Sequence, residues 1–152
     1  MYSKYLTIVL LITSFPLFSQ VTHSDTQLII STIENYFNGY IERDSHQLNK
    51  AFDTQNGTMK VPTKTKDGKV NFENKYFSDI IPKWSSRERL SPSILDNCSL
   101  EILNVDIIEG RMSTAKINMK VDNTTYIDVL SLQKINQEWK ITNKMYVILG
   151  DK

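Results

Sequence analysis

The last third of the chain, from Ser99 to Val147, has the strongest pattern. Four stretches rich in Ile, Val, Leu and Tyr are separated by short polar pairs. The pairs are Glu109-Gly110, Asp122-Asn123 and Asn136-Gln137, and each is short enough to close a hairpin. Long strands joined by tight turns form an antiparallel meander, which we expect to curl around an apolar pocket. The expected strands are Leu100–Ile108, Met112–Val121, Thr125–Lys134 and Glu138–Val147.

The first part of the chain has helical spacing instead. Ser24 with Gln27 has the form of a capping box, and Gly39 is where we expect the last turn of this helix to fray. Asp44 with Gln47 repeats the start signal and predicts a short second helix that presents Leu48, Ala51 and Phe52. One apolar stripe of a 3.6-residue period marks the first helix, and its members are Ile29, Ile33, Tyr36, Phe37 and Tyr40.

Between the helices and the meander the pattern predicts a hairpin and a third helix. Asp67-Gly68 is a strong hairpin turn, with arms at Thr58–Pro62 and Val70–Phe72. Helical spacing returns over 76–84, where Pro82 removes one N–H, so we expect the helix to end or kink there. The polar stretch 85–97 is predicted to be a loop. Helices first and sheet last is the α+β arrangement, and 152 residues suit one domain.

Strand register decides which side chains face the expected pocket. A two-residue loop at Asn136-Gln137 places Leu130 opposite Asn143 and Leu132 opposite Ile141. Alternation then gathers one inner face: Tyr126, Asp128, Leu130, Leu132, Trp139, Ile141, Asn143, Met145 and Val147. The turn at Asp122-Asn123 adds Ala115, Ile117, Met119 and Val121 to it. The outer face is predicted to carry Lys120, Lys140, Thr142 and Lys144, together with Ile127, Val129 and Tyr146.

Asp128 and Asn143 are then the two polar residues on an apolar face. A carboxylate at such a place is desolvated, so its pKa rises unless a donor compensates. Asp128 is therefore a candidate for a functional site. The alternative is that Asn143 and a tyrosine satisfy Asp128 in a purely structural network.

The aromatic and histidine residues leave similar alternatives. Tyr36 and Tyr40 are either core residues or hydrogen-bond donors to a ligand in the concave sheet. His23 and His46 have no second His or Cys at ligand spacing, so we expect no zinc site and place His46 on the surface.

The N-terminus and the charge balance bear on location and partners. Lys4, the apolar run 5–12 and the small Ser19 predict a secretory signal peptide over 1–19, with the folded domain over 20–152 and a secreted or periplasmic location. Without Lys4, 17 Lys and Arg stand against 17 Asp and Glu, which gives no electrostatic reason to bind nucleic acid or an anionic membrane. We expect no membrane span in the mature chain. The single Cys98 excludes an internal disulfide and is predicted to be a small buried residue.

The C-terminal strands also carry a resemblance. The run 126–134 (YIDVLSLQK), followed by Trp139-Lys140-Ile141 and Asn143-Lys144, resembles the C-terminal pattern of the Putative lumazine-binding family of the nuclear transport factor 2-like, cystatin-like α+β superfamily. The N-terminal pattern of that family is echoed at 36–39 (YFNG), at Asp44, and at Leu48 and Ala51-Phe52. Two departures stand out. Asp53 replaces a histidine often found there, and Gln137 replaces the usual glycine of the last hairpin.

The resemblance implies a cone, in which a strongly curved antiparallel sheet is closed by N-terminal helices. It also implies a homodimer through the outer sheet face, which would explain the apolar Ile127, Val129 and Tyr146 there. The superfamily contains isomerases, cyclases and dehydratases beside non-catalytic binding domains, so the fold names no function.

Two hypotheses about function follow. The first is an exported, non-catalytic pocket domain that binds a small, mostly apolar molecule or supports a partner. The second is an isomerase-like or cyclase-like enzyme with Asp128 as general base and Tyr36 or Tyr40 as donor to an oxyanion. Neither hypothesis calls for a cofactor or a metal. The predicted pocket residues are Tyr36, Tyr40, Phe52, Trp84, Tyr126, Asp128, Trp139 and Asn143.

Overall fold

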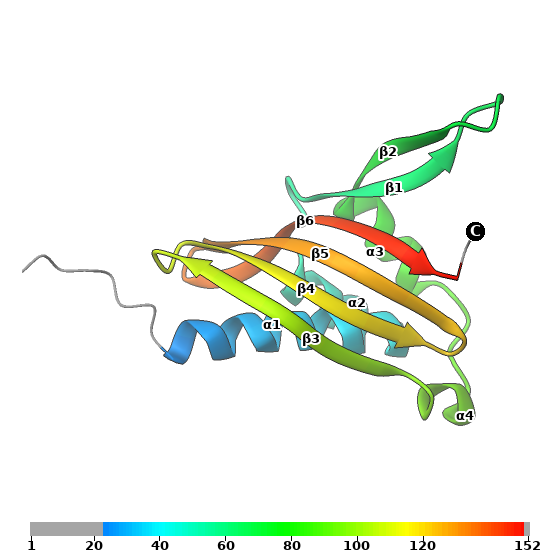
Figure 1. The fold of residues 1–152 in the computed structure, drawn as a ribbon. Coiled ribbons are helices and arrows are strands. Elements are labelled where there is room, and N and C mark those ends of the chain that lie inside the picture. Colours follow the sequence, from blue (N-terminus) through cyan, green and yellow to red (C-terminus); the bar gives the residue numbers. More distant parts are fainter. Residues whose placement is uncertain (1–22, 151–152) are drawn as a thin grey trace, which may run out of the picture.

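The computed structural model describes residues 23–150 as an α+β fold with helices packed on one face of a curved, unclosed sheet (Figure 1). The helices are α1 (His23–Glu42), α2 (Ser45–Ala51), α3 (Phe77–Ser85) and α4 (Pro92–Leu95). The strands are β1 (Thr58–Lys64), β2 (Val70–Tyr76), β3 (Ser99–Ile108), β4 (Met112–Val121), β5 (Thr124–Ile135) and β6 (Glu138–Leu149). The predicted fold class is confirmed.

The four C-terminal strands form the predicted meander, and the hairpin β1–β2 extends the same sheet. The strand order is β2-β1-β6-β5-β4-β3. All neighbours are antiparallel except β1 and β6, which pair in parallel over Thr58–Lys60 and Asn143–Met145. The sheet is therefore mixed rather than wholly antiparallel, because the connection from β1 to β6 runs through most of the chain.

Turn chemistry accounts for the tight hairpins. Asn136 and Gln137 both have positive φ, at 49° and 68°, which is the geometry of a two-residue type I′ turn. Gln137 adopts this conformation without a glycine's freedom, as the sequence predicted. Asp122 also has a positive φ of 54°.

Helix α1 runs under the sheet and is longer than predicted, because Gly39 lies in its interior. A Cβ at Gly39 would lie 2.9 Å from Leu48 Cγ and 2.9 Å from the Leu48 backbone N. Glycine there permits close packing of α2 on α1, so the expectation of a frayed turn was wrong. The helix ends at Glu42, and Arg43 follows with a φ of 62°.

The predicted N-terminal cap of α2 is confirmed. Asp44 caps α2, and its carboxylate accepts hydrogen bonds from the backbone N–H groups of His46 (2.7 Å) and Gln47 (3.3 Å). Helix α1 begins at His23, and the side chain of Ser24 lies outside the described residues, as does the predicted signal segment 1–19.

Pro82 neither ends nor interrupts α3, which continues to Ser85. The lost N–H leaves one carbonyl of the preceding turn without its helical partner, but Ser78 and Pro82 both lie on the exposed side of the helix. Water can satisfy that carbonyl, while Phe77, Ile80, Ile81 and Trp84 bury the other side. In the predicted loop 85–97, the short helix α4 begins with Pro92 at its first turn.

Candidate functional site

A β-bulge in β6 sets which side chains face the helices. Leu132 pairs with Ile141 as predicted, but Ser131 pairs with Asn143, so Thr142 is an extra residue on β6. Beyond a bulge the alternation of faces shifts by one residue. Lys144 and Tyr146 therefore point inward, and Asn143 and Met145 point outward. The predicted register was right for β4–β5 and for β5–β6 up to Leu132, and wrong beyond it.

Asn143 is consequently not a pocket residue. Its Nδ2 donates hydrogen bonds to the carbonyl oxygen of Thr58 (3.2 Å) and to Thr58 Oγ1 (3.1 Å). It anchors the first residue of β1 to β6, at the place where the parallel pairing starts. Its role is to attach the β1–β2 hairpin to the sheet.

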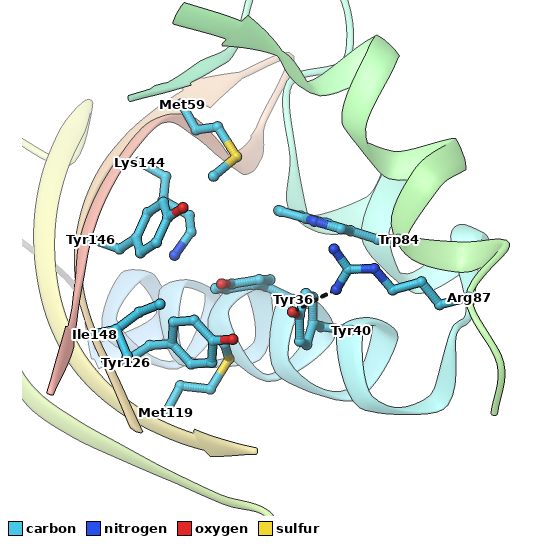
Figure 2. Close-up of a pocket in the computed structure, with 10 residues that line it drawn as sticks. All are labelled: Tyr36, Tyr40, Met59, Trp84, Arg87, Met119, Tyr126, Lys144, Tyr146 and Ile148. Atoms are coloured by element: carbon cyan, nitrogen blue, oxygen red, sulfur yellow. Dashed lines mark hydrogen bonds between the residues drawn. The ribbon is translucent and has the colours of Figure 1, made fainter. Parts of the chain in front are cut away.

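Because the bulge turns Lys144, Tyr146 and Ile148 inward, these side chains of β6 form one wall of a pocket. The pocket lies between the sheet, α1 and the end of α3 (Figure 2). Its volume is about 160 Å³. Aromatic and apolar side chains form most of the wall, with two basic residues among them. The lining residues are Tyr36, Tyr40, Met59, Trp84, Arg87, Met119, Tyr126, Lys144, Tyr146 and Ile148.

The predicted pocket residues divide into four groups. Those that line the pocket are Tyr36, Tyr40, Trp84 and Tyr126. Phe52 and Trp139 lie in the hydrophobic core, with 1% and 3% of their surface exposed. Asp128 lies behind the pocket wall with none of its surface exposed, and Asn143 is on the outer face.

Trp139 has a structural partner, Asp25, in the first turn of α1. Its Nε1–H donates a 3.0 Å hydrogen bond to Asp25 Oδ1, which also forms a 2.5 Å ion pair with Lys134 Nζ. These contacts lower the pKa of the Asp25 carboxyl, with the hydrogen bond to Lys134 as the largest cause and that to Trp139 next. The cluster ties the first turn of α1 to the β5–β6 hairpin.

Asp128 belongs to a buried network that has Lys144 in place of the predicted Asn143. Tyr36 OH donates a 2.8 Å hydrogen bond to Asp128 Oδ2, and Lys144 Nζ forms an ion pair with the same oxygen. Lys144 is 3% exposed. Asp128 Oδ1 has no hydrogen-bond partner among residues 23–150.

Burial changes the proton affinities in this network. It raises the pKa of the Tyr36 hydroxyl well above its ordinary value, and the Asp128 charge adds to the effect. Tyr36 is therefore a neutral donor. Burial also lowers the pKa of the Lys144 ammonium, although Asp128 opposes that change. The amine thus lies beside a carboxylate, in surroundings that disfavour its charge.

The mouth of the pocket is built from stacked side chains. The rings of Tyr36 and Trp84 stack at 6.2 Å, and Tyr40 meets Trp84 edge-on at 5.3 Å. Arg87 Nη1 donates a 2.9 Å hydrogen bond to Tyr40 OH (Figure 2). Burial first, and then Tyr40, raises the pKa of the Tyr126 hydroxyl to about 12. Tyr40 thus links the basic residue at the mouth to the tyrosine on β5.

The site has many hydrogen-bond donors and no negatively charged side chain among its lining residues. None of the ten lining residues is Asp or Glu, whereas Arg87 and Lys144 bring cationic groups. Burial raises the pKa of the Tyr36, Tyr126 and Tyr146 hydroxyls, so these three groups stay protonated at neutral pH and can donate.

Sequence reasoning missed five lining residues, which come from three segments of the chain. Lys144, Tyr146 and Ile148 were assigned to the wrong face or left out, since no local residue pattern marks the bulge at Thr142. Met59 comes from the hairpin, whose docking on β6 the sequence does not specify. Arg87 lies three residues after Trp84 but beyond the end of α3 at Ser85, where no helical spacing points to it.

Among residues 23–150, no group of three or more His, Cys, Asp and Glu side chains is placed to hold a metal ion. Over the same residues, no helix is long and apolar enough to cross a membrane. Cys98 is half-buried, and its Sγ–H donates to the Ile94 carbonyl at 3.3 Å.

Comparisons with known proteins place the chain in a family. Residues 24–147 match the sequence profile of the family described as "Putative lumazine-binding", and the chain belongs to that family. No curated protein matches the chain.

Solved structures share the fold at low sequence identity. A nuclear transport factor 2-like protein of unknown function from Shewanella baltica has a TM-score of 0.68 at 19% identity, covering 87% of this chain and all (100%) of its own. One from Methylobacillus flagellatus has a TM-score of 0.66 at 21% identity, covering 86% and 96%. A cystatin-like fold protein from Burkholderia xenovorans has a TM-score of 0.61 at 11% identity, again covering 86% and 96%. The chain therefore has the nuclear transport factor 2-like fold.

Proposed function

We propose that the chain is a non-catalytic binding domain for a small, flat, mostly apolar molecule that presents an oxygen acceptor to Lys144. The observation that carries this proposal is the 160 Å³ pocket with its aromatic wall and its donor groups. An engineered apolar cavity of about 150 Å³ binds benzene. The ligand is accordingly about one substituted ring in size, well below the ~300 Å³ at which drug-sized sites begin.

The position of Asp128 favours binding over acid–base catalysis. A general base must lie within hydrogen-bond reach of the proton that it removes. Asp128 has no exposed surface, and Tyr36 and Lys144 occupy its Oδ2 on the side of the pocket. The enzyme hypothesis with Asp128 as base therefore requires a rearrangement of both partners, and we prefer the binding hypothesis.

A pair of variants on neighbouring residues of β6 tests the proposal. Ile148→Trp fills the pocket, whereas Val147→Trp adds the same side chain to the outer face, where Val147 is 56% exposed. Benzamide, a ring with one carbonyl acceptor, is titrated by ligand-observed NMR. Binding to the wild type and to Val147→Trp, with loss in Ile148→Trp, is the expected result. Equal binding to all three proteins would overturn the pocket as the site, and no binding to any would overturn the proposed ligand class.

A retained natural ligand provides an independent test. Native mass spectrometry of the protein purified without denaturation should find a bound small molecule of this class. Because Ile148→Trp occupies the same space, the extra mass should be absent from that variant and present in Val147→Trp.

We also propose that the protein is a homodimer through the outer sheet face. Val129 and Met145 lie directly opposite each other on β5 and β6, and they are 40% and 49% exposed. Val147 continues the patch beside Ile127. Of the residues first predicted for this face, Tyr146 turns inward at the bulge, and Met145 and Val147 take its place. Sedimentation of the wild type should give a dimer, and Met145→Glu a folded monomer; a monomeric wild type would overturn the proposal.

Export is proposed from the sequence of residues 1–19. The residues that match the family begin at 24, after this segment. N-terminal sequencing of the protein from its native cells should find the mature chain starting close to Gln20. A chain that retains Met1 in the cytoplasm would overturn this proposal.

A further inference from the structure

Lys144 differs from the other lysines of the described chain. It is the buried lysine of residues 23–150, with 3% of its surface exposed. It is also a lining residue of the pocket, and Figure 2 shows its amine directed between the rings of Tyr36 and Tyr146. Nζ lies 5.4 Å and 4.8 Å from the centroids of those rings. A primary amine is thus held in an aromatic site of limited volume.

Burying a lysine costs free energy unless other groups pair with its charge. Replacing a buried ion pair with apolar residues is often neutral or stabilising, so stability alone gives little reason for this one. Lysines in hydrophobic pockets gain nucleophilicity, since desolvation favours the neutral amine, and these are the lysines that form Schiff bases. The burial of Lys144 lowers the pKa of its ammonium and so favours the neutral amine.

We propose that Lys144 captures a small aromatic aldehyde as a reversible imine, an inference that rests on the proposed binding function of the same pocket. The pocket accepts about one substituted ring, and Lys144 is placed where the carbonyl of that ring would lie. The aldehyde class follows from the amine, and the aromatic class follows from the rings of Tyr36, Trp84 and Tyr146 around it.

Asp128 completes the chemistry as the proton carrier. The Lys144 ammonium gives one proton to the carboxylate, which already shares an ion pair with it. The neutral amine attacks the aldehyde carbon, a C–N bond forms as the C=O π bond opens, and the oxygen takes a proton from the attacking nitrogen to give a carbinolamine. The proton held by Asp128 then goes to the carbinolamine hydroxyl, which leaves as water as the C=N bond forms. The nitrogen keeps its remaining proton as an iminium paired with Asp128, or gives it to that carboxylate to leave the neutral imine.

The buried network of Asp128, Lys144 and Tyr36 contains the atoms that these reaction steps need. Tyr36 OH holds Asp128 Oδ2 at 2.8 Å and keeps the carboxylate in place. The proton passes between Lys144 Nζ and Asp128 Oδ2, the two atoms of the ion pair. The carbinolamine hydroxyl is two bonds from Nζ and therefore close to the same carboxylate. The step needs no oxidant, reductant or cofactor.

Reductive trapping of the wild-type full-length protein tests the inference without a destabilising variant. The protein is incubated with benzaldehyde and cyanoborohydride near neutral pH, and the benzylated lysines are mapped by peptide mass spectrometry. Lys144 should be modified at least about tenfold faster than exposed lysines such as Lys83 and Lys120, because only Lys144 is desolvated and held beside the bound ring in the pocket. An excess of benzamide should slow the modification of Lys144 and leave Lys83 and Lys120 unchanged.

The outcomes separate this inference from the proposed function. Benzamide binding that Ile148→Trp abolishes, with Lys144 modified no faster than Lys83 or Lys120, overturns the imine and leaves the binding function standing. Rapid modification of Lys144 in Val147→Trp but not in Ile148→Trp supports both. Absence of benzamide binding together with unselective modification overturns both. Lys144→Arg, which keeps the charge beside Asp128, should lose the trapped adduct while its thermal unfolding stays cooperative.

Discussion

The carboxylate of Asp128 on β5 and the ammonium of Lys144 on β6 form an ion pair in the interior of the fold. The pair exists because one extra residue, Thr142, turns Lys144 from the outer face to the inner face. Tyr36 adds a hydrogen bond from α1, so the network joins the helix to two strands.

The first prediction concerns the stability of this network. Asp128→Asn leaves a buried ammonium without a counter-charge, and removal of one partner from a buried pair costs about 3–5 kcal/mol. The free energy of unfolding in urea should fall by about 3 kcal/mol. The double variant Asp128→Leu/Lys144→Met should recover most of that loss, because it removes both charges. An Asp128→Asn protein as stable as the wild type would contradict an organised network.

The second prediction concerns the contact between α1 and α2. Alanine in a helix interior is normally about 1 kcal/mol more favourable than glycine. At Gly39, however, a Cβ would lie 2.9 Å from both Leu48 Cγ and the Leu48 backbone N, and backbone cannot move aside cheaply. Gly39→Ala should therefore destabilise the protein by about 1–3 kcal/mol. Ser31→Ala, at an exposed position of the same helix, is the matched control and should stabilise it slightly; a stabilised Gly39→Ala would refute the close contact.

The third prediction concerns the pH dependence of stability through Asp25. Lys134 and Trp139 hold the folded-state pKa of Asp25 below its unfolded value near 3.9. The contribution of Asp25 is therefore fully present above that unfolded pKa and is lost as pH falls through the folded pKa. Asp25→Asn should cost about 1–3 kcal/mol at pH 7, as expected for hydrogen bonds to a charged group, and progressively less below pH ~4. Urea unfolding curves at a series of pH values check this, and a pH-independent difference would contradict it.

The fourth prediction concerns the register of β6 beyond the bulge. In a Cys98→Ser background, Leu149→Cys should react rapidly with a thiol reagent in the folded protein, because Leu149 is 54% exposed on the outer face. Tyr146→Cys should react more slowly, since that position faces the pocket. An uninterrupted ladder would reverse this order, so the ratio of the two rates decides between the registers.

The elements of the fold could be predicted because they depend on local periodicity. The helical stripe of Tyr36 and Tyr40 and the turns at Asp122-Asn123 and Asn136-Gln137 are short-range patterns. The register of β4 on β5 also followed, since an uninterrupted ladder carries the alternation from the turn to the strand end. The apolar inner face at Ile117 and Leu130 was thus predicted correctly.

The chemistry of the pocket could not be predicted in the same way. A bulge inserts one residue without any local residue pattern, yet it reverses the face of every later side chain. Because of the extra residue Thr142, Lys144 and Tyr146 face the interior in place of the predicted Asn143 and Met145. The parallel docking of β1 on β6 brought in Met59 through contacts between segments far apart in the chain.

The sequence by itself determined the order of helices and strands, the tight turns and the presence of an apolar inner face. Periodicity and turn preferences act over a few residues and need no knowledge of the partner strand. Only the tertiary structure decided that Asp128 meets Lys144 and Tyr36 rather than Asn143. Such a pairing depends on the long-range register of two strands and a helix, where a single extra residue outweighs every local preference.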